Sequence, residues 1–164
     1  MNDVVVRRAT PAEWAAAGRI TVAAYLAGNH IDSHTGGYAD KLVNAAARAE
    51  EAELLVAVDD QEVLGTVTIV RPNTPWAEVS EKGELEFRML AVSPTAQGRG
   101  IGDRLVQAVI AYAKEEGAHH LVLSSSEHMT TAHRLYARHG FERLPARDWQ
   151  PLPNLTAHAY TLAL

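Results

Sequence analysis

A glycine-rich turn constrains the fold of this chain more than any other segment does. The turn reads Gln97-Gly98-Arg99-Gly100-Ile101-Gly102, between an apolar strand-like segment at 84–92 and an apolar pattern of helical spacing at 100–117. The chain must therefore pass from a strand through the turn directly into a helix. Such a turn exposes consecutive N–H groups, and the helix dipole adds positive potential beside them. The sequence thus predicts an anion site at this turn.

Other meanings of the turn remain open at this stage. It could be a tight turn before a surface helix. If it is an anion site, Arg99 either adds positive charge to that site or lies in solvent. A Walker phosphate loop is excluded because no Gly-Lys-Ser/Thr follows. A Rossmann site fits poorly, because the preceding strand is not the first of a βαβ unit and no acidic ribose ligand follows at the expected spacing.

The remaining pattern predicts a mixed α/β chain that forms a single domain over residues 1–164. Strands are expected at 4–6, 54–58, 63–70, 84–92, 121–124, 141–144 and 157–164. Helices are expected from the Thr10-Pro11-Ala12-Glu13 start signal to Gly28, and at 39–51, 100–117 and 129–139. Loops are expected at 29–37 and 71–83, and the prolines of 145–153 should break the chain.

Composition excludes several classes of protein. The net charge of −5 gives no basic surface for nucleic acid, and no apolar run approaches the roughly 20 residues of a membrane span. The chain has no cysteine, which excludes disulfides, thiolate metal sites and a cysteine acyl-enzyme. The first residues carry charges where a signal peptide needs an apolar stretch. A cytoplasmic protein is therefore expected.

Two spaced motifs resemble those of the GCN5-related N-acetyltransferase superfamily. The family pattern Gln/Arg-x-x-Gly-x-Gly/Ala is met by Gln97, Gly100 and Gly102. The pattern Ala-x-x-x-Tyr-x-x-x-Gly-Phe is met by Ala132, Tyr136, Gly140 and Phe141. The order of the other elements also fits, so the resemblance covers nearly the whole chain and is weakest before residue 54.

The resemblance implies the acyl-CoA N-acyltransferase fold, with a central twisted, mostly antiparallel sheet of about six to seven strands and about four flanking helices. It implies that backbone groups near Leu90, Ala91 and Val92 hold the pantetheine arm of acetyl-CoA. It also implies that the turn from Gln97 holds the pyrophosphate, through amides of Gly98, Arg99, Gly100, Ile101, Gly102 and Asp103. A bulge in the 84–92 strand and a splayed 121–124 strand would open the site.

Transfer to an amine needs a base and an acid. Glu86 is the candidate base by family spacing; the alternative is a structural or substrate-binding carboxylate that pairs with an arginine. Glu84 lies on the same face of the strand and is the alternate, with a substrate-binding role predicted for it. Tyr136 is the candidate acid for the leaving thiolate; the alternative is a core tyrosine on an amphipathic helix.

The polar loop between the first two helices contains His30, Asp32 and His34. A metal site there is disfavoured, because no further ligand is evident, and no metal is expected. The resemblance puts this loop near the acceptor entrance, which makes Tyr25, His30 and His34 candidate acceptor residues. Relatives often carry Asn at the position of Met129, and its side-chain amide contacts the cofactor. In this chain that contact is missing or is supplied by Ser125, Ser126 or Thr130.

The sequence therefore predicts an acetyl-CoA-dependent N-acetyltransferase that acts by direct attack in a ternary complex. The alternative is a non-catalytic acyl-CoA-binding sensor or regulatory module. The expected partners are acetyl-CoA and an unidentified amine acceptor. Dimers are frequent among similar proteins, so a homodimer is one option for the oligomeric state, which the sequence leaves open. The turn identifies the donor and carries no information on the acceptor.

Overall fold

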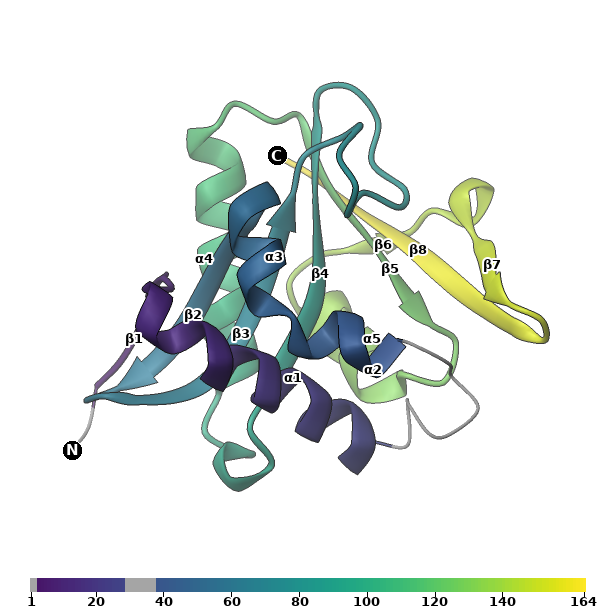
Figure 1. Ribbon diagram of the computed structural model, residues 1–164. Coiled ribbons are helices and arrows are strands. Elements are labelled where there is room, and N and C mark those ends of the chain that lie inside the picture. Colours follow the sequence, from purple (N-terminus) through teal and green to yellow (C-terminus); the bar gives the residue numbers. More distant parts are fainter. Residues whose placement is uncertain (1–2, 29–37) are drawn as a thin grey trace. The chain divides into compact units, whose positions relative to one another are not determined.

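The computed structural model describes residues 3–28 and 38–164, and the contacts of the chain gather in two compact units. The first unit holds residues 1–69 and 89–105, and the second holds 70–88 and 106–164. Strand β4 (Glu84–Val92) and helix α4 (Ile101–Glu115) each contribute residues to both units. Figure 1 follows the order of the elements along the chain, which confirms the mixed α/β class.

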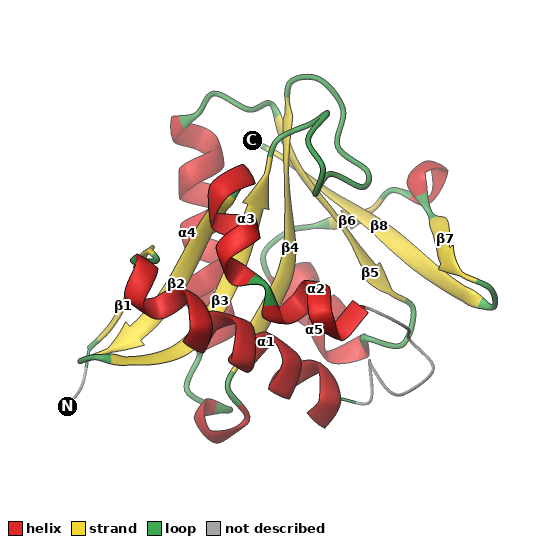
Figure 2. Ribbon diagram, viewed as in Figure 1, coloured by secondary structure: helices red, strands yellow, loops and turns green. Residues whose placement is uncertain are grey.

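The first unit pairs β1 (Val4–Arg8), β2 (Glu53–Asp59) and β3 (Glu62–Val70) as antiparallel neighbours. Helices α1 (Trp14–Ala27), α2 (Tyr38–Val43) and α3 (Ala45–Glu51) lie on one side of β2 and β3 (Figure 2). Residues 54–58 of β2 are all buried, as expected of an apolar strand that is covered on both faces. Ala17 of α1 and Ala45 of α3 pack against this strand, because their small side chains allow close approach.

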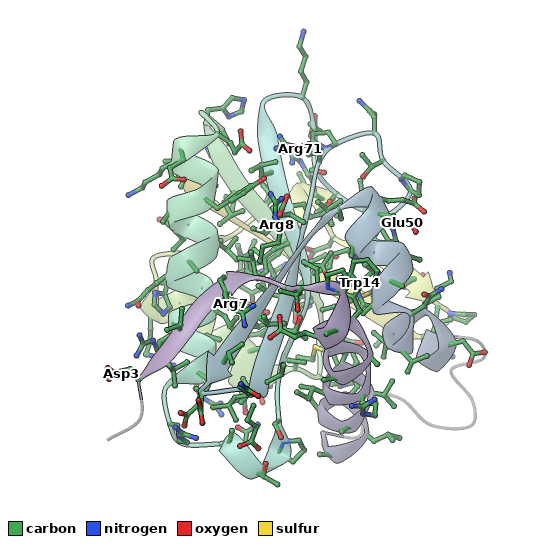
Figure 3. All side chains as sticks on the ribbon, turned by 60° about the vertical axis from the view of Figure 1, so that its left-hand side comes forward. Asp3, Arg7, Arg8, Trp14, Glu50 and Arg71 are labelled. Carbon is green, nitrogen blue, oxygen red and sulfur yellow. The ribbon has the colours of Figure 1, made fainter. Side chains whose placement is uncertain are left out.

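The start of the first helix follows the predicted signal. The Glu13 carboxylate accepts from the Thr10 amide at 2.9 Å and from the Arg7 guanidinium at 2.7 and 2.8 Å. The hydrogen bonds from Arg7 outweigh burial and lower the pKa of Glu13 to about 2. A short 3₁₀ turn, Pro11–Glu13, then leads into α1 at Trp14 (Figure 3).

The prediction of one helix at 39–51 is wrong, because the chain forms α2 and α3 with a break at Asn44. The Asn44 side chain accepts from the Ala47 amide at 3.2 Å and caps the start of α3. The fully buried Arg48 donates to the carbonyls of Lys41 and Leu42, both at 2.8 Å, and so satisfies the end of α2.

The second unit is built around β5 (His120–Ser126) and β8 (Leu155–Ala163), which pair antiparallel. β5 also pairs in parallel with the start of β4, while β6 (Glu142–Arg143) and β7 (Trp149–Leu152) pair antiparallel with β8. Helix α5 (Thr130–Arg138) follows β5 in the chain (Figure 2). The sheet is thus mostly antiparallel, as predicted.

The prediction that residues 145–153 only break the chain is wrong at 149–152, where β7 forms. Trp149 pairs with Ala157, and Leu152 pairs with Leu155, with an irregular register between them. An edge strand tolerates Pro151 because the missing N–H need not face a partner. With β7 and the divided second helix, the described residues form eight strands and five α-helices. No helix in these ranges has the length and apolar character of a membrane span.

Candidate active site

The glycine-rich turn lies in the first unit and leads into α4 at Ile101, as the sequence predicts. The first backbone hydrogen bond after the turn runs from the Arg104 amide to the Gly100 carbonyl at 3.1 Å. Within the described part of the chain, the amides of residues 98–102 donate to no backbone carbonyl. Residues 97–100 are exposed. The turn therefore offers a row of main-chain donors beside the positive end of a helix dipole.

Positions 98 and 100 require glycine because of their backbone conformation and not because neighbouring atoms leave no room for a side chain. Their φ angles are 81° and 75°, in the left-handed region that other residues rarely adopt. A Cβ at either position would meet nothing within 4 Å. The close approach occurs instead at Gly65 of β3, where a Cβ would lie 2.9 Å from Ile101 Cγ2 and 3.0 Å from the Ala91 carbonyl oxygen.

Side chains of the turn are used to hold it in place. The Arg99 guanidinium donates to the Asp59 carboxylate at 2.9 Å, so its charge is already compensated, although the side chain stays 42% exposed. The Gln97 side-chain amide lies 3.4 Å from the Val92 carbonyl, at the end of β4. Main-chain groups thus supply most of the anion-binding capacity of the turn.

Strand β4 departs from regular geometry before the segment predicted to hold pantetheine. Met89 has a φ of 57°, which is uncommon for a residue with a side chain, and Leu90, Ala91 and Val92 follow it. In the second unit, the parallel pairing of β4 with β5 covers 84–86 and 120–122. β5 continues to pair with β8 as far as Ser126. The two strands therefore part after Glu86 and Val122, as the resemblance implies.

Tyr136 is almost fully buried on α5, at 5% exposure. Its ring packs edge-on against Phe87 at 5.8 Å and against Phe141 at 6.0 Å, and lies 5.8 Å from the Tyr160 ring. Burial raises the pKa of the Tyr136 hydroxyl well above its usual value. In the described ranges the hydroxyl has no hydrogen-bond partner. It is therefore a neutral donor with its proton still available.

Glu86 is completely buried, and its carboxylate is held by the loop before β4. The backbone amides of Glu78, Val79 and Ser80 donate to it at 3.0 to 3.3 Å. The Ser80 hydroxyl adds a bond of 2.8 Å. These donors occupy the oxygens that a base would need, so the geometry favours a structural role for Glu86. Its partners are main-chain amides rather than the arginine that the sequence suggested.

Glu84 is the carboxylate that pairs with an arginine. It accepts from Arg147 at 2.6 and 3.1 Å and from the Glu81 amide at 2.8 Å. Burial alone would raise the pKa of Glu84, but the Arg147 and Glu81 hydrogen bonds outweigh it and lower that pKa. His119 and His120 place ring nitrogens within 4.8 Å of the Glu84 carboxylate. Because Arg147 already occupies both Glu84 oxygens, this group is poorly suited to a cation.

Of the three other predicted acceptor residues, the described structure contains Tyr25 alone. Tyr25 is buried on α1 in the first unit, at 9% exposure. His30 and His34 lie outside the described residues. At the position where relatives carry Asn, the Met129 sulfur accepts from the Ser125 hydroxyl at 3.5 Å, and His133 Nε2 lies 3.2 Å from that hydroxyl.

A polar cluster in the second unit was not predicted. We call it the Arg88–Glu78 cluster, formed by Trp76, Glu78, Arg88, Ser124 and Trp149. Glu78 Oε1 lies 3.0 Å from Arg88 Nε and accepts from the Ser124 hydroxyl at 3.4 Å. Arg88 Nη1 donates to the Trp76 carbonyl at 2.9 Å, and Trp149 Nε1 donates to Ser124 at 3.1 Å. The one available sequence signal was a charged residue, Arg88, on the same strand face as Glu84 and Glu86.

Comparison with known proteins identifies the family. The Acetyltransferase (GNAT) family model matches residues 19–141. The chain is 32% identical over 104 residues to the uncharacterized N-acetyltransferase YhfO of Bacillus subtilis (strain 168), which covers 63% of this chain and 68% of that protein. Other curated relatives are much longer than the match, since it spans 19% to 43% of their length.

Solved structures share the fold over nearly the whole chain. A GCN5-related N-acetyltransferase from Kribbella flavida has 26% identity and a TM-score of 0.71, with 98% of each chain covered. The acetyltransferase yncA from Salmonella typhimurium, solved with acetyl-CoA, has 24% identity and a TM-score of 0.69, covering 99% of this chain and 94% of its own. The motifs, the fold and the family match agree, and the chain therefore belongs to the Acetyltransferase (GNAT) family and is an acyltransferase.

Proposed function

We propose that this enzyme transfers the acetyl group of acetyl-CoA to a primary amine by direct attack in a ternary complex. The observation that carries the proposal is the row of main-chain amides at residues 98–102, at the start of α4. The acetyl-CoA bound to the yncA structure, which has the same fold, supports the choice of donor.

The donor would be held mainly by the backbone. Amides from Gly98 to Asp103 would bind the pyrophosphate, while groups of Leu90, Ala91 and Val92 would bind the pantetheine arm in the manner of an added strand. Because Arg99 is already paired with Asp59, main-chain amides rather than the Arg99 side chain would make the main contacts to the pyrophosphate.

The chemistry requires a neutral amine and a proton for the leaving group. The amine nitrogen attacks the thioester carbonyl carbon, and the carbon–sulfur bond breaks. The thiolate takes a proton from the Tyr136 hydroxyl, and the proton that the nitrogen loses restores that hydroxyl. The raised pKa of Tyr136 keeps the hydroxyl protonated at neutral pH, so the proton is present when the thiolate forms. We assign Glu86 the task of holding the loop at 78–80, since its oxygens already accept from that loop.

The test is to incubate the protein with acetyl-CoA and a panel of primary amines and to follow thiol release, with mass spectrometry of the products. Release that depends on the amine, with a product heavier by one acetyl group, supports the proposal. Tight acetyl-CoA binding without release for any amine would support the non-catalytic binding module instead. The cytoplasmic location remains a prediction of the sequence, and a homodimer remains one option for the oligomeric state.

A further inference from the structure

The Arg88–Glu78 cluster lies where the two central strands of the second unit part. Side chains alternate along β4, so Arg88 shares one face with Glu86, while Phe87 points to the opposite face and contacts Tyr136. The β4–β5 pairing ends at Glu86 and Val122, two residues before Arg88 and Ser124 on their strands. Beyond the paired segment, Arg88 and Ser124 both contact the Glu78 carboxylate.

The ion pair of the cluster is largely withdrawn from water. The side chains of Arg88 and Glu78 are 12% and 21% exposed. Removing both charges from water costs free energy that their mutual attraction does not fully offset. An apolar pair at this position would make the folded protein at least as stable, so the presence of two charges favours a binding role over a purely stabilising one.

Hydrogen-bond donors exceed acceptors in the cluster. A guanidinium carries five N–H donors, of which Arg88 uses those on Nη1 and Nε toward the Trp76 carbonyl and Glu78 Oε1. The Trp76 indole N–H is buried and has no acceptor among the described residues. Because a buried donor without a partner is unfavourable, a bound group that brings oxygen acceptors would satisfy the Trp76 indole N–H.

We propose that the acceptor is an amino acid or a similar small zwitterion, whose carboxylate binds Arg88 and the Trp76 indole N–H while its amine lies at Glu78. This inference rests on the proposed acetyl transfer and names its substrate class. Arg88 Nε and Glu78 Oε1 are only 3.0 Å apart, so the two charges of the acceptor must also be close. A single carbon between amine and carboxylate meets that requirement.

Glu78 then has a place in the reaction. The bound ammonium gives one proton to the Glu78 carboxylate, which passes it to solvent. The nitrogen forms the new carbon–nitrogen bond as the carbon–sulfur bond breaks, and its second proton replaces the one that Tyr136 gives to the thiolate. Glu86 serves this step by fixing the backbone of 78–80, and with it the position of Glu78.

The test compares matched acceptors that differ at the carboxylate. Each set contains an amino acid, its amide and the amine without the carboxylate, such as leucine, leucinamide and 3-methylbutylamine. Parallel sets based on methionine, phenylalanine and arginine cover other side chains. The kcat/KM for thiol release should favour the amino acid over its amide by about a hundredfold or more in at least one set.

Arg88→Gln should lower the ratio of kcat/KM for the amino acid to that for its amide towards one. Arg88→Lys keeps the charge but loses the paired N–H donors of the guanidinium, so it should reduce this ratio less. Glu78→Gln should lower kcat and flatten the acid limb of the pH profile. The control is Arg71→Gln, which removes another arginine–glutamate pair of the second unit, Arg71–Glu116 at 2.8 Å, and should leave the ratio unchanged.

Transfer to simple amines and amides with no preference for amino acids would overturn this inference and leave the proposed function intact. A ratio unchanged in both folded Arg88 variants would also overturn it. Acetyl-CoA binding with transfer to no member of any set would contradict the proposed function itself. Thermal unfolding of each variant establishes that it is folded.

Discussion

The turn at 97–102 and the Arg88–Glu78 cluster achieve recognition in opposite ways. The turn presents main-chain amides, and its arginine is used internally to pair with Asp59. The cluster presents side chains drawn from the loop before β4, from β4 itself, from β5 and from β7. One region depends on backbone conformation, and the other depends on which side chains the fold brings together.

This difference has a chemical reason. A pyrophosphate is the same group whichever acceptor is used, so repeated amides and a helix dipole suffice to bind it. An acceptor must be told apart from similar amines, which requires charges and donors at particular points. Changes of side chain should therefore alter the acceptor side strongly, while the donor side should respond mainly to changes of backbone conformation.

The largest expected effect is at a single side-chain hydroxyl. Tyr136→Phe keeps the ring packing against Phe87 but removes the proton for the thiolate. We expect kcat to fall by about a hundredfold, with acetyl-CoA affinity within about twofold of the original. Steady-state kinetics and calorimetry check both values. Tyr160→Phe, in the same aromatic group, is the control, and equal losses in the two variants would remove the special role of Tyr136.

Glu86→Gln tests whether this carboxylate holds the loop or acts as a base. Loss of its charge weakens the bonds from residues 78–80, so we expect the KM for the amine to rise by about tenfold or more, with acetyl-CoA affinity unchanged. The pH dependence of kcat should keep its shape. A large fall in kcat at constant KM, with loss of the acid limb, would instead establish Glu86 as the base.

Gly100→Ala tests the backbone of the turn against a matched glycine. Gly100 and Gly117 have φ angles of 75° and 76°, and a Cβ at either would meet nothing within 4 Å. Alanine should therefore lower the free energy of unfolding by a similar ~1–2 kcal/mol at both positions. Only Gly100→Ala should weaken acetyl-CoA binding, by about tenfold, because the amides of the turn would no longer point toward the pyrophosphate. Equal affinity in the two variants would count against the turn as the donor site.

The smallest expected effect is the acid sensitivity of the Glu84–Arg147 ion pair. Because the folded protein lowers the pKa of Glu84 below its ordinary 4.5, its stabilisation is fully present above that pH and is lost as the pH falls through the lower folded value. The free energy of unfolding of the wild type should exceed that of Glu84→Gln by about 1–3 kcal/mol at pH 7, and the gap should narrow in acid. A gap that stays constant from pH 7 to pH 3 would contradict this assignment.

The same contrast explains what could be predicted from the sequence. The turn, its strand and its helix are contiguous, so spacing alone located them, and Tyr136 followed from a second local motif. The cluster joins residues that are 10 to 46 positions apart, and no local pattern reports such contacts. The break at Asn44 was missed because a side-chain cap outweighed the helical periodicity around it, and β7 was missed because two prolines concealed an edge strand.

The most direct test of the account is whether the amides of the turn bind the pyrophosphate. An NMR titration of ¹⁵N-labelled protein with CoA, and separately with pantetheine, isolates that part of the ligand. The amide signals of Gly98, Gly100 and Gly102 should shift strongly with CoA and little with pantetheine. Unchanged signals at these three glycines, while other residues saturate with CoA, would contradict the central claim.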